Sequence, residues 1–289
     1  MKLSQIKILF QEEIPHIYSK SEIDELFSVF CGHFLKMNKM ELRNNTNLDI
    51  SDSDSSRLID AISALKTGKP FQQILGETEF YGMRFFVDEN VLIPRPETEE
   101  LLELAIKKIK ERFTAKTKFK ILDIGTGSGV IPIVLKTHFP DALVSAIDIS
   151  SEALEIAKKN ADFHNTEINF VQKDYLNEAF DSAEADNEIY DVIISNPPYI
   201  GIEENADIEH SVKGFEPNIA LFSPTSDALI FYRKIAADCK NHLAENGLLF
   251  LEINQKLGKE TLELYQNGFS EVQLLKDISG NDRLIFGIR

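Results

Sequence analysis

Four consecutive residues, Asn196-Pro197-Pro198-Tyr199, combine an amide, two ring-constrained residues and an aromatic ring. They follow the apolar run at 191–195, which predicts a buried strand. Proline lacks a backbone N–H and restricts the residue before it to extended geometry. The segment should therefore present a stiff cluster of oxygen acceptors at the end of a strand, where it could hold a planar –NH2 group. Taken alone, the segment is also compatible with a simple proline exit from the strand.

A glycine-rich turn, Gly125-Thr126-Gly127-Ser128-Gly129, lies between a short apolar run at 120–124 and a helical pattern at 130–138. Strand, glycine turn and helix is the arrangement in which a nucleotide-bearing ligand lies against exposed backbone amides at a switch point of a sheet. Glycine permits positive φ and lets a ligand approach the backbone closely. The spacing departs from the dinucleotide pattern G-x-G-x-x-G at its last position, which is Val130.

Acidic and aromatic residues follow the next two predicted strands. Asp148 ends the strand expected at 143–147, where a carboxylate is placed to accept hydrogen bonds from both ribose hydroxyls. Asp174-Tyr175 follows the strand expected at 168–172 and could supply an acceptor and a ring to an adenine. A surface turn with a locally packed tyrosine is the alternative there. Together with the glycine turn, these residues favour a nucleoside cofactor.

The segment 123–129, Asp148 and the tetrad Asn196-Pro197-Pro198-Tyr199 resemble an S-adenosylmethionine-dependent methyltransferase of the amino-methylating type. The tetrad is shared with adenine-N6 and guanine-N2 nucleic-acid methyltransferases, so by itself it implies the chemistry and leaves the substrate open. Further segments are similar to the HemK/PrmC family: 70–76, 79–82, 91–99, 215–217 with 220–221, 251–253 and 277–283. The similarity runs from about residue 70 to the C-terminus. It implies methylation of the glutamine side-chain nitrogen in the Gly-Gly-Gln tripeptide of peptide chain release factors.

The resemblance also implies functional positions. The cofactor-binding positions would be Asp123, Gly125, Thr126, Gly127, Ser128, Gly129, Asp148, Asp174, Tyr175 and Asn196. Substrate contacts would come from Asn196, Pro197, Pro198 and Tyr199, with Asn196, Pro197 and Tyr199 catalytic. Our hypothesis is that the Asn196 side-chain oxygen and the Pro197 carbonyl each accept one N–H of the substrate glutamine, while Tyr199 packs against the flat amide.

Two positions depart from the family's usual residues. Asn254 stands where glycine is usual after Glu-Ile, and we expect little effect because asparagine tolerates left-handed backbone. Tyr175 replaces a frequent tryptophan and keeps a smaller aromatic surface for adenine.

The composition is that of a globular protein, with 43% hydrophobic and 27% charged residues among 289. Cys31 and Cys239 are far apart and the six histidines are scattered, so neither a disulfide framework nor a metal site is indicated. No apolar run is long enough for a membrane span, and the first residues lack the apolar core of a signal peptide. A cytoplasmic, metal-free enzyme is expected.

Three other functions compete with this interpretation. A net charge of −16 and acidic stretches at 181–191 and 203–209 disfavour the nucleic-acid methyltransferase, because phosphate binding depends on Lys and Arg. A non-catalytic cofactor-binding module is disfavoured because both the tetrad and the glycine turn are intact. A dinucleotide oxidoreductase is disfavoured by the glycine spacing.

The elements that must position these residues fall into three parts. We expect a helical substrate-recognition domain at 1–72, a β-hairpin linker at 73–95 and an α/β methyltransferase domain at 96–289. Ser19 and Glu22 fit a capping box before a helix at 21–36, and further helices are expected from 51–54 to 67 and at 226–244. The hairpin is predicted from the run 80–87, with 88–90 as its turn. Strands are expected at 120–124, 143–147, 168–172, 191–195, 247–253, 270–275 and 283–288, and the resemblance implies a seven-stranded Rossmann-like sheet.

Overall fold

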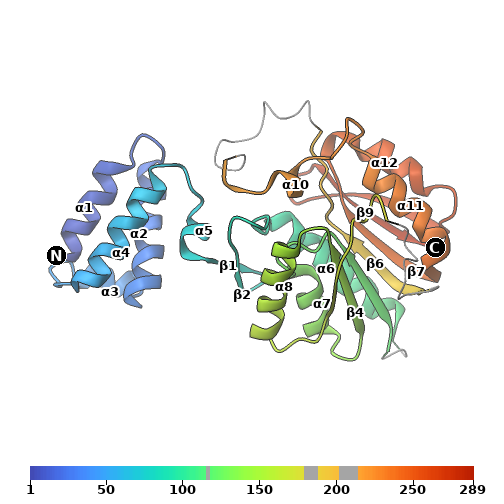
Figure 1. Ribbon diagram of the computed structural model, residues 1–289, viewed down its shortest axis with the longest axis horizontal. Coiled ribbons are helices and arrows are strands. Elements are labelled where there is room, and N and C mark those ends of the chain that lie inside the picture. Colours follow the sequence, from blue (N-terminus) through green and yellow to red (C-terminus); the bar gives the residue numbers. More distant parts are fainter. Residues whose placement is uncertain (115–117, 179–187, 202–213) are drawn as a thin grey trace. The chain divides into compact units, whose positions relative to one another are not determined.

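The computed structural model describes residues 1–114, 118–178, 188–201 and 214–289 (Figure 1). The chain divides into two compact units, Met1–Glu77 with Glu209–Phe215, and Thr78–Ile208 with Glu216–Arg289. Residues 181–187 of the first acidic stretch and the whole second stretch, 203–209, lie outside the described residues. Among the residues that the structure does describe, none of the helices has the length and apolar character to cross a membrane.

The first unit is helical. Its helices are α1 (Leu3–Glu13), α2 (Lys20–Leu35), α3 (Lys39–Asn44), α4 (Asp52–Leu65) and α5 (Phe71–Leu75). The capping box is confirmed: the Glu22 amide donates to Ser19 Oγ, and the Ser19 amide donates to the Glu22 carboxylate at 2.7 Å. Phe10 and Phe30 are fully buried, and the ring of Phe10 meets that of Phe27 edge-on. The unit therefore has an apolar core of its own.

A two-stranded hairpin, β1 (Glu77–Phe80) and β2 (Met83–Phe86), follows the helices. A turn does lie at 89–90, within the expected range 88–90, but it follows the hairpin; the hairpin itself reverses at Tyr81-Gly82, so its predicted position was wrong. Both residues have positive φ, 53° and 67°, as a tight two-residue hairpin turn requires. Glycine adopts this backbone readily, but tyrosine does so rarely, so no local pattern of residues predicts the turn.

The second unit is built on a seven-stranded sheet, and the predicted α/β fold is confirmed. Its strands are β3 (Lys120–Ile124), β4 (Leu143–Asp148), β5 (Asn169–Gln172), β6 (Tyr190–Ser195), β7 (Leu243–Glu252), β8 (Glu271–Lys276) and β9 (Asp282–Ile288). They lie in the order β5-β4-β3-β6-β7-β9-β8, and only β9 runs antiparallel to both of its neighbours. From β3 the chain continues outward through β4 and β5, then returns to the other side of β3 as β6.

Helices cover both faces of this sheet (Figure 1). They are α6 (Pro96–Arg112), α7 (Val130–His138), α8 (Ser151–Phe163), α11 (Ile230–His242) and α12 (Gly258–Tyr265). The short helix α10 (Asn218–Leu221) and the 3₁₀ turn η2 (Gln255–Leu257) lie in the connections after β6 and β7. Side chains alternate along each strand. Ile121 and Val192 pack with α6 and α7 in one core, whereas Leu122 and Ile193 pack with α11 in the other.

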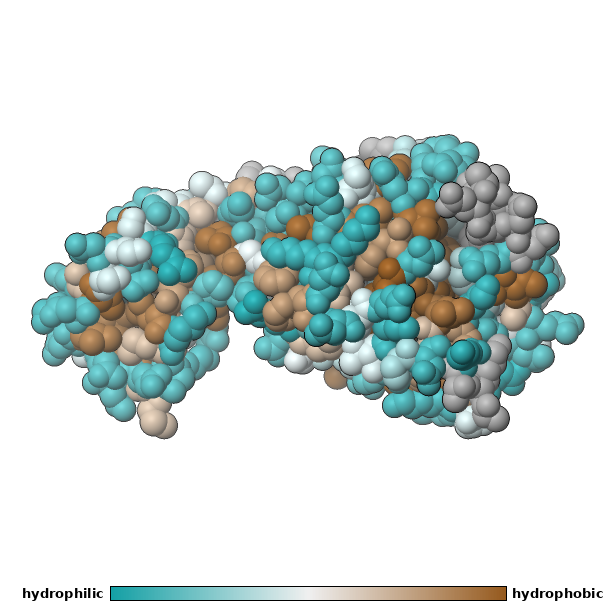
Figure 2. Space-filling model, turned by 60° about the horizontal axis from the view of Figure 1, so that its bottom comes forward, coloured by the Kyte–Doolittle hydropathy of each residue, from teal (hydrophilic) through white to brown (hydrophobic). Residues whose placement is uncertain are grey.

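Helix α11 begins four residues later than the predicted start at 226. The Asp227 carboxylate accepts the Leu229 amide at 2.9 Å, so a short turn precedes the helix. Figure 2 shows hydrophilic side chains over much of the visible surface, with apolar patches between them.

Candidate active site

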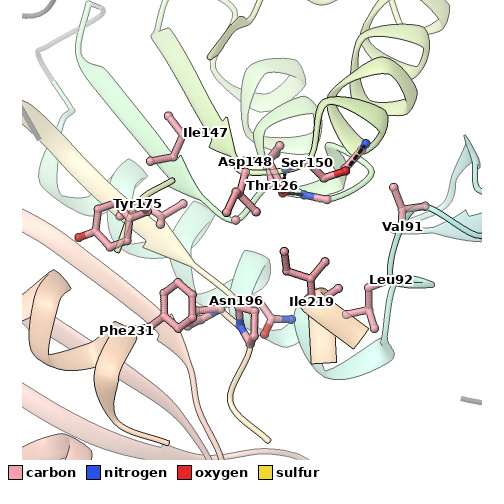
Figure 3. A pocket seen from close by; sticks show the side chains of 18 of the residues that line it. Val91, Leu92, Thr126, Ile147, Asp148, Ser150, Tyr175, Asn196, Ile219 and Phe231 are labelled. Atoms are coloured by element: carbon pink, nitrogen blue, oxygen red, sulfur yellow. Dashed lines mark hydrogen bonds between the residues drawn. The ribbon is translucent and has the colours of Figure 1, made fainter. Parts of the chain in front are cut away.

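A cavity of about 440 Å³ lies at the carboxyl ends of the central strands of the sheet unit. Strand order reverses between β3 and β6, and α/β sheets bind ligands at such a switch point. Ten of the predicted site residues line the cavity: Gly125, Thr126, Gly127, Ser128, Asp148, Asp174, Tyr175, Asn196, Pro197 and Pro198. Figure 3 shows Ile147 and Asp148 across the cavity from Asn196 and Phe231, with Tyr175 at one end and Val91 and Leu92 at the other.

Three predicted residues are not part of the cavity lining. Asp123 is fully buried in β3. Gly129 begins α7 with φ 81°, and a Cβ there would come within 3.0 Å of Ala157. Tyr199 donates its hydroxyl to the Glu252 carboxylate at 3.3 Å. These three residues therefore contact other protein groups next to the cavity and do not form part of its wall.

The glycine turn does not present its amides as expected. The Gly125 and Thr126 amides both donate to the Ile147 carbonyl, at 2.9 and 3.0 Å. The Gly127 amide donates to Asp148 at 2.8 Å. The positive φ angles fold the turn back onto β4, so that its amides donate to acceptors at the end of that strand. The glycines therefore let a ligand approach the backbone closely, but the amides of Gly125, Thr126 and Gly127 are already used within the protein.

Two acidic residues lie at or behind the cavity wall: Asp148 lines the cavity, and Asp123 is buried in β3 just before the glycine turn. Asp148 accepts the Gly127 and Ser150 amides, while burial raises its pKa and these backbone bonds oppose the rise. Burial raises the pKa of Asp123 to about 7, against a lowering effect of the Thr126 hydroxyl. Within the described residues, no hydrogen bond of 3.5 Å or less reaches the oxygens of Asp123 or Thr126 Oγ1, so the effect of the Thr126 hydroxyl on Asp123 is a weak one. Such uncompensated buried acceptors favour a cationic ligand or water nearby.

Tyr175 forms an apolar end of the cavity. Its hydroxyl donates to Asp238 on α11 at 2.7 Å, which fixes the ring. Asp174 accepts the Leu176 and Asn177 amides at 3.2 Å, so it also organises the turn after β5.

Asn196 extends from the end of β6, and its side-chain nitrogen donates to Thr98 Oγ1 at 3.0 Å. The Thr98 hydroxyl in turn donates to Glu252 at 2.7 Å. In the described part of the chain, no donor reaches the side-chain oxygen of Asn196 or the carbonyl of Pro197. Those two oxygens are the acceptors that the sequence hypothesis requires.

The sequence did not single out four residues that shape the site. Thr98 and Glu252 hold the tetrad, and Arg95 and Glu216 hold the cavity wall formed by α10. Glu216, with only 1% of its side chain exposed, accepts Arg95 at 2.6 Å and the Ile93 amide at 2.9 Å. All four lie in segments that carried the family resemblance, which was the one signal available for them.

Asn254 does not adopt the left-handed backbone considered for it, because its φ is −63°. Its side-chain oxygen caps η2 by accepting the Lys256 amide at 2.9 Å. Its side-chain nitrogen donates to the Tyr199 carbonyl at 3.1 Å. A glycine could make neither bond, so this chain fixes the end of its tetrad with a side chain.

Sequence relatives match nearly the whole chain. The family model of the methyltransferase small domain matches residues 102–212. A release factor glutamine methyltransferase of Flavobacterium psychrophilum is 41% identical over 286 residues, covering 99% of this chain and 98% of the relative. That of Bacteroides thetaiotaomicron is 36% identical over 284 residues, covering 98% and 99%. That of Streptococcus pneumoniae is 37% identical over 288 residues, covering 99% and 98%.

Solved structures share the fold at low identity. The hMettl16 catalytic domain in complex with an RNA hairpin has a TM-score of 0.53 and 16% identity, covering 92% of this chain and 90% of that one. A Thermus thermophilus 16S rRNA N2 G1207 methyltransferase has a TM-score of 0.50 and 17% identity, covering 74% and 49%. These likenesses concern the fold alone, whereas the relatives share sequence along both chains. This chain therefore belongs to the release factor glutamine methyltransferase family.

Proposed function

We propose that this protein transfers a methyl group from S-adenosylmethionine to the side-chain amide nitrogen of the Gly-Gly-Gln glutamine in peptide chain release factors. The name shared by its full-length relatives supports the substrate. The observation that carries the chemistry is the arrangement of Asn196. Its amide nitrogen donates to Thr98, which leaves its side-chain oxygen at the cavity to accept an N–H of the substrate.

The cavity residues fit the proposed cofactor. Asp148 keeps lone pairs beside its two backbone bonds and would accept the ribose hydroxyls. Tyr175 and Asp174 line the cavity and would contact the adenine. When bound, S-adenosylmethionine supplies an electrophilic methyl group on a sulfonium.

The protein's task is then to position a weak nucleophile, because an amide nitrogen shares its lone pair with the carbonyl. Asn196 Oδ1 and the Pro197 carbonyl would each accept one N–H of the substrate carboxamide. This holds the face of the nitrogen toward the cofactor side and stabilises the positive charge that develops on it. Alignment of this kind can lower a barrier by roughly 7–11 kcal/mol. No general base is assigned, because the methylated amide loses its proton readily to water.

A transfer assay with labelled methyl donor tests the function. Purified release factor, the same factor with the Gly-Gly-Gln glutamine replaced by alanine, duplex DNA and ribosomal RNA are offered in turn. We expect label on the first alone. Label on either nucleic acid and none on the release factor would refute the proposal.

We further propose that the helical unit recognises the body of the release factor, because it has its own core and none of its described residues lines the cavity. A chain starting at residue 76, after α5 and before β1, should bind S-adenosylmethionine and methylate a short Gly-Gly-Gln peptide as the whole chain does. Its kcat/KM on intact release factor should fall strongly. Unchanged kcat/KM on the intact factor would remove this role from the helical unit.

A further inference from the structure

The side-chain amide of Asn196 has two ends of nearly the same shape, and only one serves the proposed reaction. The oxygen end accepts a substrate N–H, whereas the nitrogen end would place two donors against the donors of the substrate. Rotation of the amide by half a turn would exchange them. Something in the protein must therefore specify which end faces the cavity.

Thr98 supplies that specification through the direction of its own hydrogen bond. Its hydroxyl carries a single hydrogen, which is committed to Glu252 Oε2 at 2.7 Å. The lone pairs of Thr98 Oγ1 then remain for Asn196, 3.0 Å away, and they can only accept. The nitrogen of Asn196 must point to Thr98, so the oxygen points away from it.

Glu252 is the final acceptor in this series of hydrogen bonds, and it sets the direction of the other two groups. It ends β7 next to β6, is 1% exposed, and an ionised carboxylate has no hydrogen to donate. Its other oxygen accepts the Tyr199 hydroxyl at 3.3 Å. One buried carboxylate therefore contacts both ends of the tetrad, Asn196 through Thr98 and Tyr199 directly.

The negative charge of Glu252 has a nearby counterion. Arg283 precedes Leu284, which pairs with Glu252 across the sheet, and the Ile253 amide donates to the Arg283 carbonyl at 2.9 Å. The guanidinium favours the ionised carboxylate and is itself held by Asp277 at 3.1 Å. Burial raises the pKa of Glu252 to about 7 against this effect of Arg283, so the carboxylate is a pure acceptor above that pH.

We propose that Thr98 and Glu252 are positioning residues for methyl transfer: the Glu252 carboxylate orients the Thr98 hydroxyl, which locks the Asn196 amide with its oxygen toward the acceptor nitrogen. This inference rests on the proposed function of the site. Thr98 and Glu252 should therefore affect kcat, but not the affinity for release factor or for S-adenosylmethionine.

The decisive comparison is Thr98→Val with Thr98→Ser, because valine has the shape of threonine without the hydroxyl and serine keeps it. Thr98→Val should lower kcat by about 10²-fold, the loss typical of a misplaced reacting group. KM for release factor and the dissociation constant for S-adenosylmethionine should stay near wild type. Thr98→Ser should keep most of the wild-type kcat.

Thr261→Val is the matched control. Thr261 is also fully buried in the sheet unit, and its hydroxyl donates to the Leu257 carbonyl at 2.7 Å, outside the cavity lining. Its loss should change the melting temperature without changing kcat. Wild-type kcat in Thr98→Val, or an equal loss in Thr98→Ser, would overturn the proposal, as would a loss confined to KM.

Glu252→Gln gives a second and independent reading, also if Thr98→Val fails to fold. Its amide can turn –NH2 toward Thr98, which frees the hydroxyl to donate to Asn196 Oδ1 and reverses the chain. We expect a loss of kcat, and a double variant with Thr98→Val no slower than the slower single variant. Additive losses would overturn the proposal. A wild-type enzyme that fails to methylate release factor would instead refute the proposed function, and the variants would then be compared on the acceptor it does methylate.

Discussion

The hydroxyl of Ser195, the last residue of β6, donates to the carbonyl of Ile124, the last residue of β3, at 2.7 Å. This bond closes the sheet at the point where the strand order reverses. It also sets Asn196 beside Gly125, where a Cβ would lie 4.0 Å from the Asn196 carbonyl oxygen. The register of β3 and β6, which pairs Ile124 with Ser195, therefore places the tetrad next to the glycine turn.

Replacement of Asn196 by alanine should separate chemistry from cofactor binding. The variant lacks the acceptor for one substrate N–H, and we expect kcat to fall by about 10²–10³-fold. The dissociation constant for S-adenosylmethionine, measured by calorimetry, should change by only a few-fold, because Asp148 and Tyr175 are untouched. Turnover within a few-fold of wild type would mean that Asn196 does not hold the substrate amide.

Replacement of Asp148 by alanine should have the opposite pattern. Hydrogen bonds to a charged group contribute about 1.5–3 kcal/mol each, so the loss of the ribose contacts should raise the dissociation constant at least tenfold. Asp162→Ala, which removes an exposed carboxylate on α8, is the control and should bind as wild type. An unaltered dissociation constant in the Asp148 variant would place the ribose elsewhere.

The pH dependence of kcat should report Glu252. Burial raises the pKa of Glu252 to about 7, opposed by the Thr98 hydroxyl and the charge of Arg283, while Glu97 raises it and Tyr199 lowers it. Below that pH the carboxyl gains a proton and no longer acts only as an acceptor. At saturating S-adenosylmethionine, kcat should therefore rise with pH between about 6 and 8 and then level off.

Glu252→Gln is the control for this profile, because a glutamine does not titrate. Its residual kcat should vary little over the same pH range. Asp123 has a raised pKa near the same value and remains in the variant, so a profile that persists would assign the titration to Asp123 or another group.

Breaking the pair between Arg95 and Glu216 should destabilise the sheet unit. Glu216 would stay buried without its counterion, which costs roughly 3 kcal/mol, the low end for such pairs because the arginine is one-third exposed. Arg95→Ala should thus lower the unfolding free energy in urea by that amount. Arg233→Ala, which breaks an exposed pair with Asp227, should cost less than about 1 kcal/mol. Equal losses in both variants would remove the special role of the buried pair.

The sheet could be predicted because its strands are short apolar runs with turn residues at their ends. The run 191–195 is followed by Pro197, and 120–124 by Gly125, so both strand ends were marked locally. The acceptors at Asn196 and Pro197 were predicted from the same residues, because these residues end the strand. The hairpin turn was missed because its left-handed Tyr81 has no local signature.

The supporting residues could not be derived from local patterns. Thr98 and Glu252 are 154 positions apart, and Arg95 and Glu216 are 121 apart. Their contacts exist only after β7 has paired with β6 and the segment after 214 has folded against 93–95. A spacing rule describes one helix or one turn, and it cannot report side chains that meet across a sheet.

The Gly125, Thr126 and Gly127 amides donate to acceptors within the protein, and this affects how well other nucleotides of the cell can compete for the cofactor cavity. ATP and the nicotinamide dinucleotides share the adenosine half of the proposed cofactor and are abundant. Their phosphates would meet a turn whose N–H groups already serve Ile147 and Asp148, next to a carboxylate of the same sign as the phosphate. The turn thereby discriminates against polyanions, and the enzyme should keep working in a medium crowded with adenine nucleotides.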